Sequence, residues 1–389
     1  MTYTLTDPGR LAGRFPRARI AVAAAFALNG SMLGTWAARV PAVVEKFTLS
    51  EGTLGLLLLV MGIGALVSFP VAGKLSDRRG AYPVTCALVV VYLAATVALG
   101  LAPSVPLLAA ALFLAGIGHG AMDVTMNAWA AEVERGMGRS VMSSFHAMWS
   151  LGAGLGAAGG YFATRAELPI ALHFPLAALV VAVLFGPLIR TTWASRRNAQ
   201  PQGNPVFAFP RGTLVLVGLI ALGAGLGEGA AADWSAVYLT DITGATVSIA
   251  ALGYAVFSVT MVIMRLNVDG LITKHGPVVI ARFSGVSAAM GFGLAVGFAT
   301  LPATLAGIVL MGMGYAAVIP LAFSRAAADP EVPPGQAIAS VATLAYGAML
   351  MGPPLIGFIA QISSLRVSFA LIGLMALLIA LLAPVLRRA

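Results

Sequence analysis

The stretch Gly116–Trp149, GIGHGAMDVTMNAWAAEVERGMGRSVMSSFHAMW, joins an apolar segment, a short charged loop and a second apolar segment. Its first part carries His119, Asp123 and Asn127 four residues apart. An α-helix brings residues at this spacing onto one face. Because lipid cannot solvate such a stripe, it must face a cavity or another helix if the segment lies in a bilayer. This stretch therefore predicts membrane-spanning helices with an inward polar face.

Composition supports a membrane setting for the whole chain. Of 389 residues, 59% are hydrophobic and 10% are charged, against about 25% charged residues in soluble domains. The formal charge of +9 would suit a nucleic-acid partner in a soluble protein. Here the basic residues cluster in short loops between apolar segments, so we expect a lipid bilayer and no nucleic acid as partner. The single cysteine, Cys86, allows neither a disulfide framework nor a cysteine metal site.

Twelve segments are long enough to span a bilayer, at about 18 to 26 residues each. They are 18–39, 51–73, 83–102, 105–131, 140–162, 169–190, 212–236, 247–267, 277–299, 302–325, 336–360 and 367–386. The longest polar interval, 191–211, predicts a cytoplasmic linker. It would separate an N-terminal six-helix bundle over 1–190 from a C-terminal six-helix bundle over 212–389.

The basic residues also predict the orientation. With the N-terminus inside, nineteen of the 23 Lys and Arg residues fall on the cytoplasmic side, among them Arg265 near the inner end of the eighth span. Only Arg39, Lys46, Arg165 and Arg366 fall outside. The positive-inside rule therefore predicts a multi-pass protein of the cytoplasmic (inner or plasma) membrane with both termini cytoplasmic.

Landmarks recur between the two halves at a nearly constant offset of 196 to 198 residues. They are Trp36 with Trp234, Gly80 with Gly276, Gly116 with Gly312 and Gly138 with Gly335. A constant offset predicts an all-α fold of two parallel six-helix repeats.

The loop between the second and third spans, GKLSDRRG at Gly73–Gly80, resembles the signature G-x-L-x-D-R-x-G of the major facilitator superfamily. It departs from that signature in having Ala81 and Tyr82 where two basic residues follow. The second copy, Asp269–Gly276, keeps only part of the pattern. The resemblance implies a role in conformational change for Gly73, Asp77, Arg78 and Gly80.

Three further runs, GIGHGAMDVTMNAWAAEVE, SSFHAMWSLGAG and GEGAAADWSAVYL, are similar to the fucose-permease-like branch of that superfamily and to its MosC-like permeases. The resemblance implies alternating access around a central site lined mainly by the first, fourth, seventh and tenth helices. In the fucose permease a carboxylate on the fourth helix takes part in proton coupling, and Asp123 stands at the similar place here. The first helix offers Asn29 and Ser31 where that permease has an acid.

Asp123 is also a candidate on physical grounds alone. An acid near the middle of a spanning helix costs about 2.5 to 3.5 kcal/mol on insertion scales, so it is rarely idle. Counted from opposite membrane faces, Asp123 lies roughly 27 Å and His146 roughly 9 Å along their helices, nearly one depth in a core of about 30 Å. The proton-coupling candidates are Asp123, His146, His119 and Glu228. The alternative is that Asp123 only bonds His119, Asn127 or a helix end structurally.

The seventh span carries Glu228 in its outer third and Asp233 beside Trp234 at the outer interface. Arg39, at the outer end of the first span, is a candidate to close an outer gate against Asp233. A solvated interfacial pair is the alternative for these two residues.

Polar and aromatic residues on several spans form the predicted solute pocket. They are Asn29, Ser31, Trp36, Asn127, Trp149, Tyr254, Tyr315 and Tyr346. This mixture suits a small polar or sugar-like solute. Glycine-rich stretches on the fifth and seventh spans predict close helix packing, and Gly352-Pro353-Pro354 predicts a break or a hinge in the eleventh.

These features together predict a proton-coupled secondary active transporter, a symporter of a small organic solute, and we expect a monomer. The alternatives are proton-driven efflux of a drug or metabolite and, less favoured, a non-transporting membrane receptor or assembly protein. The chain contains no HExxH, nucleophile elbow, nucleotide-binding loop or metal cluster, so we expect no enzyme activity, cofactor or metal.

Overall fold

The computed structural model describes residues 14–137, 141–191, 193–195, 209–332 and 334–387, and the regular structure in these ranges is helical. Eleven described segments are long and apolar enough to cross a membrane. A twelfth helix, α6 (Met142–Arg165), is of similar length but is not among the eleven, because its glycine and polar residues make it less apolar. The predicted all-α polytopic membrane fold is confirmed.

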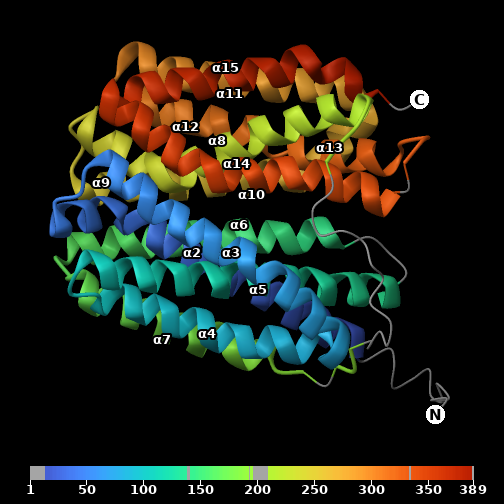
Figure 1. The fold of residues 1–389 in the computed structure, drawn as a ribbon, viewed down its shortest axis with the longest axis horizontal. Helices are drawn as coiled ribbons and strands as arrows, with labels where there is room; N and C mark the ends of the chain where they lie inside the picture. The colour runs from blue at the N-terminus through green and yellow to red at the C-terminus, as the bar shows by residue number, and fades with distance from the viewer. Residues whose placement is uncertain (1–13, 138–140, 192, 196–208, 333, 388–389) are drawn as a thin grey trace.

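The first helices pack together as an N-terminal helix group, in the lower part of Figure 1. Within this group α2 packs along α6, and α3 packs along α5. The group consists of α2 (Arg14–Phe47), α3 (Glu51–Arg79), α4 (Ala81–Leu101), α5 (Val105–Met137), α6 and α7 (Ile170–Ile189). Several of these helices extend past the predicted spans.

The remaining helices form a C-terminal helix group in the upper part of Figure 1. Across the two groups α6 packs against α10, α3 against α14 and α2 against α8. The group consists of α8 (Thr213–Asp241), α9 (Val247–Ala250), α10 (Leu252–His275), α11 (Pro277–Phe298), α12 (Leu301–Tyr315), α13 (Val318–Ala327), α14 (Pro334–Ile362), α15 (Leu365–Leu382) and η1 (Ala383–Leu386).

Proline acts differently on two of these helices. The predicted span 302–325 is broken at Ala316 and Ala317 into α12 and α13. Pro320 explains the break, because it has no N–H to bond the carbonyl four residues earlier. The expected break at Pro353 and Pro354 is wrong, since α14 continues through both, and a hinge at this place stays a prediction.

Glycines let α2 and α6 approach to backbone contact. A Cβ on Gly30 or Gly34 of α2 would collide with the carbonyl oxygen of Trp149 or Ala153 on α6, and a Cβ on Gly156 of α6 would collide with that of Ser31. The close packing predicted for the glycine-rich fifth span is therefore observed.

Gly80 and Gly276 close equivalent connections in the two groups. Gly80 follows α3 at φ 96°, and Gly276 follows α10 at φ 82°. Each donates its N–H to a carbonyl four residues earlier, that of Ser76 or Ile272. A positive φ favours glycine, so the offset of these two landmarks has a structural reason. The motif before Gly80 is the last part of α3 instead of a loop.

Most of the predicted linker 191–211 lies outside the described residues. Its described beginning contacts the N-terminal helix group. The Ser195 hydroxyl accepts the N–H of Tyr82 at 2.9 Å, and the Trp193 indole donates to Glu132 at 2.8 Å.

Candidate functional site: two acids between the helix groups

Asp123 lies on α5 with an amide as its partner. The Asn127 side chain donates to the Asp123 carboxylate at 3.1 Å and to its backbone carbonyl at 2.9 Å. No Lys, Arg or His side chain in the described ranges forms an ion pair with Asp123. The phenol of Tyr346, on α14 of the other helix group, lies within electrostatic range of the carboxylate. Asp123 therefore faces the seam between the two helix groups. Its hydrogen bond to Asn127 also fits the alternative that Asp123 has only a structural role.

The two histidines among the proton-coupling candidates, His119 and His146, have aromatic neighbours. The ring of His119 packs edge-on with that of Tyr92 at 5.7 Å between centroids, and its buried Nδ1 has no hydrogen-bond partner among the residues that the structure describes. The ring of His146 meets Phe26 at 5.2 Å. His146 also lies within electrostatic range of Arg265, whereas no hydrogen bond among the described residues joins it to Asp123.

Asn29 ties three helices of the N-terminal group together. Its Oδ1 accepts the indole N–H of Trp149 on α6 at 2.9 Å, and its Nδ2 donates to the His119 carbonyl on α5 at 3.3 Å. Ser31 instead donates to the Ala27 carbonyl within α2 at 2.7 Å and is buried. The hydroxyl of Ser31 is therefore hydrogen-bonded within its own helix.

Trp36 and Trp234, paired by the repeat, are both buried, and the indole N–H of each has no hydrogen-bond partner within the described ranges. Trp36 lies beside Phe174, at 6.5 Å between ring centroids. Both side chains pack in the interior of their helix group.

The three predicted tyrosines differ in exposure. Tyr254 and Tyr315 are buried, whereas Tyr346 is 38% exposed and meets the edge of the Phe69 ring at 5.3 Å. Tyr315 lies against Gly227, where a Cβ would overlap its ring, and its hydroxyl has no hydrogen-bond partner in the part of the chain that the structure describes. Tyr346 is the accessible member of the set.

Glu228 on α8 is paired with a cation that the sequence did not suggest. Its Oε2 lies 3.5 Å from Nη2 of Arg265, and the two side chains are 22% and 13% exposed. Tyr254 and Tyr315 lie within electrostatic range of Glu228. Arg265 lies near the end of the apolar segment Val247–Val268, and α10 continues beyond it to His275; its assignment to the cytoplasmic side stays a prediction. The repeat carried a signal that Arg265 lies inside the bundle, because the counterpart of Arg265 at offset 196 is Phe69, which lies inside a predicted span.

The expected outer pair is not formed in this structure. Arg39 is buried and donates from Nη2 to the Leu168 carbonyl at 2.8 Å, within its own helix group. Asp233 lies within electrostatic range of Tyr254. No ion pair among the described residues joins Arg39 to Asp233.

The signature residues lie at the end of α3. Arg78 is exposed, and Asp77 is half-buried in the last turns of the helix. A Cβ on Gly73 would meet open space. Their part in conformational change stays a prediction.

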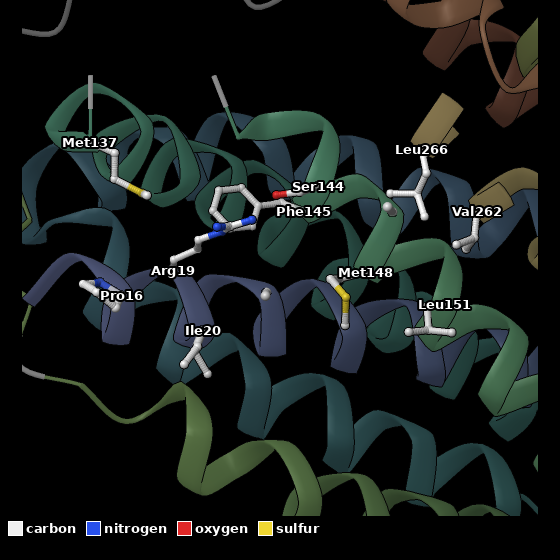
Figure 2. Close-up of a pocket in the computed structure, with 12 residues that line it drawn as sticks. Pro16, Arg19, Ile20, Met137, Ser144, Phe145, Met148, Leu151, Val262 and Leu266 are labelled. Atoms are coloured by element: carbon white, nitrogen blue, oxygen red, sulfur yellow. The ribbon is translucent and has the colours of Figure 1, made fainter. Parts of the chain in front are cut away.

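A lateral cavity of about 540 Å³ lies between α2, α6 and α10. Figure 2 shows Ile20, Met148, Leu151 and Val262 on its walls, with Arg19 beside them. Its lining is mostly apolar and does not include Asp123, Glu228 or Arg265. The cavity is thus separate from the site that contains Asp123, Glu228 and Arg265.

Comparisons with known proteins agree with this arrangement. The family model described as Major Facilitator Superfamily matches residues 19–332. An uncharacterised transporter, y4wD of Sinorhizobium fredii, is 55% identical over 94% of this chain and 97% of its own length. Membrane protein MosC of Rhizobium meliloti is 29% identical over 88% of this chain and 83% of its own length.

Solved structures share the fold at low identity. A point mutant of the nucleoside transporter NupG has a TM-score of 0.75 at 11% identity, covering 96% of this chain and 99% of that one. A D-xylose-proton symporter has a TM-score of 0.71 at 16% identity, covering 94% of this chain and 96% of that one. Together with the match over most of the sequence, these findings show that the chain belongs to the major facilitator superfamily of membrane transporters.

Proposed function

We propose that the protein is a proton-coupled secondary active transporter of a small polar organic solute, with Asp123 as the proton carrier. The observation that supports this most is the setting of Asp123. It lies in a spanning helix with the neutral Asn127 amide as its bonded partner and no paired cation among the described residues. Its negative charge is therefore balanced by a bound proton or by a cationic group that a solute brings.

The position of Asp123 between the helix groups suits alternating access. Asp123 on α5 faces Tyr346 on α14, so movement of one group against the other changes its surroundings. We propose that residues 1–190 and 212–389 are the two moving bodies and that 191–211 links them in the cytoplasm. Both termini are then cytoplasmic, and the protein lies in the cytoplasmic membrane as a monomer.

The solute would meet the polar and aromatic groups near Asp123. Tyr346 is accessible, and the Asn29–Trp149 pair lies on neighbouring helices. Hydrogen-bonding groups beside aromatic faces favour a small polar or sugar-like compound.

Proton flux in proteoliposomes tests the proposal. A pH-sensitive dye trapped inside would report proton entry when sugars, polyols, sugar acids and aminosugars are added outside. We expect flux with at least one solute for the wild type and none for Asp123→Asn. Asp241→Asn is the matched control, because Asp241 is exposed at the end of α8.

The same assay separates the alternatives. Protons that move opposite to the solute indicate efflux by exchange, which contradicts symport. Solute movement that stays proton-coupled in Asp123→Asn would show that another group carries the proton. Absence of solute movement across the panel would favour a non-transporting receptor on the same fold.

A further inference from the structure

Arg265 is a cation held inside the helix bundle. It lies on α10, within the apolar segment Val247–Val268, and its side chain is 13% exposed. It points across the seam, because its Nη1 donates to the Ser150 hydroxyl on α6 at 3.0 Å. Ser150 in turn donates to the His146 carbonyl at 3.3 Å. Arg265 thus links the two helix groups.

The guanidinium of Arg265 is only partly used. Nη2 lies 3.5 Å from one oxygen of Glu228, and Nη1 binds Ser150. Nε is buried and has no hydrogen-bond partner among the described residues. A guanidinium offers five N–H donors in a planar fork that matches both oxygens of a carboxylate. The single long contact to Glu228 does not have that geometry.

A buried guanidinium needs an anion beside it. Arginine keeps its proton in proteins, so its charge cannot be removed by titration. Leaving such a charge unpaired in an apolar bundle is strongly unfavourable. If Glu228 leaves Arg265 or becomes neutral, another anion must therefore take its place.

We propose that Arg265 binds a carboxylate group of the transported solute, which takes the place of Glu228 on the guanidinium. This deepens the proposed function, on which it rests, by naming the solute class as monocarboxylates. The proton carried by Asp123 enters with the solute anion, so one negative and one positive charge move together.

The surroundings of the pair allow such an exchange. Glu228 is 22% exposed, and a Cβ on the next residue, Gly229, would meet open space. The titratable groups within electrostatic range of the pair are Tyr254 on α10, Tyr315 on α12 and His146 on α6, and Asp233 on α8 lies within range of Tyr254. Arg265 is the cation among the described groups that face this space.

Equilibrium binding to the full-length protein in detergent tests the proposal at one pH and without a gradient. The probes are two matched pairs, acetate with acetamide and D-glucuronate with D-glucose. We expect wild type to prefer the carboxylate of each pair. Glu228→Gln removes the internal competitor, so its affinity for acetate should rise by about tenfold or more.

Variants of the cation complete the test. Arg265→Gln should lose the preference for carboxylates, and Arg265→Lys, which keeps the charge without the fork, should weaken it. If Arg265→Gln does not fold, the carboxylate preference of Arg265→Lys alone tests the proposal. Arg366→Gln is the control, because Arg366 is exposed and binds the Val296 carbonyl. Equal affinity for acetate and acetamide in both wild type and Glu228→Gln, or undiminished carboxylate preference in both Arg265 variants, would overturn the proposal.

Failure of this inference is distinguishable from failure of the proposed function. Asp123→Asn should keep carboxylate binding, because Asp123 does not contact Arg265 in the described structure. If the wild type shows no proton flux but still binds carboxylates, the proposed function fails and the Arg265 site stands. Proton-coupled movement of neutral solutes, with no carboxylate binding, leaves the function standing and removes the Arg265 site.

Discussion

Asp123 on α5 and Glu228 on α8 are both acids inside spanning helices, but their charges are balanced differently. Asp123 is bonded to the neutral amide of Asn127, whereas Glu228 is paired with Arg265. Removing the charge of Asp123 leaves no described cation unpaired, while removing that of Glu228 leaves a guanidinium alone in the bundle. The first setting suits a group that gains and loses a proton, and the second suits a group exchanged for another anion.

The comparison extends to the helices that the repeat relates. At offset 196 from Asp123 the chain has Ile319, next to Pro320, which breaks the counterpart of α5 into α12 and α13. The C-terminal group therefore carries its acid on another helix. Two copies of one fold have retained the helix packing while placing different chemistry in each copy.

The largest effect should come from removing one charge of the Arg265–Glu228 pair. Arg265→Gln leaves a buried carboxylate without its cation, and we expect a loss of about 3 to 5 kcal/mol in the free energy of unfolding. The double variant Arg265→Gln, Glu228→Gln should recover most of this loss, because neither charge is then unpaired. Denaturant titration in detergent, followed by tryptophan fluorescence, measures both. A double variant as unstable as the single one would show that the pair is solvated.

Gly227 tests how tightly the C-terminal group holds Tyr315 beside Glu228. A methyl group on Gly227 would fall on the Tyr315 ring. Overpacking of this kind costs about 1 to 3 kcal/mol, so Gly227→Ala should lower the free energy of unfolding by that amount. Gly229→Ala is the matched control on the same helix, because its methyl group would meet open space. Equal stabilities for the two variants would mean that Tyr315 moves aside freely.

Gly80 and Gly276 compare the same connection in the two groups. Both have positive φ, so alanine should cost about 1 to 2 kcal/mol at either position. Gly80→Ala should cost more, because its methyl group would also lie 2.7 Å from the Ser195 side chain, whereas Gly276 faces open space. Gly73→Ala, in the helical part of the motif, is the control. Thermal unfolding in detergent ranks the three, and a larger loss at Gly276 would contradict the packing difference.

Much of the fold was predictable because it depends on local patterns. Apolar length marked the helices, and the offset between Gly80 and Gly276 reflects a backbone conformation that favours glycine. Glycines of the fifth span predicted close helix packing, and the structure shows α2 as the partner. These signals lie within one segment or recur at a fixed offset, so they can be read from the sequence without knowledge of the tertiary structure.

The site was less predictable because its partners are distant in sequence. Glu228 and Arg265 meet from α8 and α10, and Ser150 comes from the other helix group. A count of basic residues assigns each to the nearer membrane face, so it gave no sign that Arg265 pairs with Glu228 inside the bundle. Asp123 was found because its helix is otherwise apolar at that depth. The Arg39–Asp233 pair followed from topology alone, and the structure gives Arg39 a backbone partner instead.

The smallest change in stability should come from Asp123→Asn. Asparagine keeps the shape of the side chain and an oxygen that can accept the Asn127 amide. Since no described cation loses its partner, the free energy of unfolding should change by about 0.5 kcal/mol or less. Proton-coupled flux should nevertheless be abolished, because an amide cannot carry the proton. Denaturant titration and the flux assay on one preparation separate these effects. A stability loss as large as that of Arg265→Gln would mark Asp123 as a structural acid and would remove the difference between the two sites.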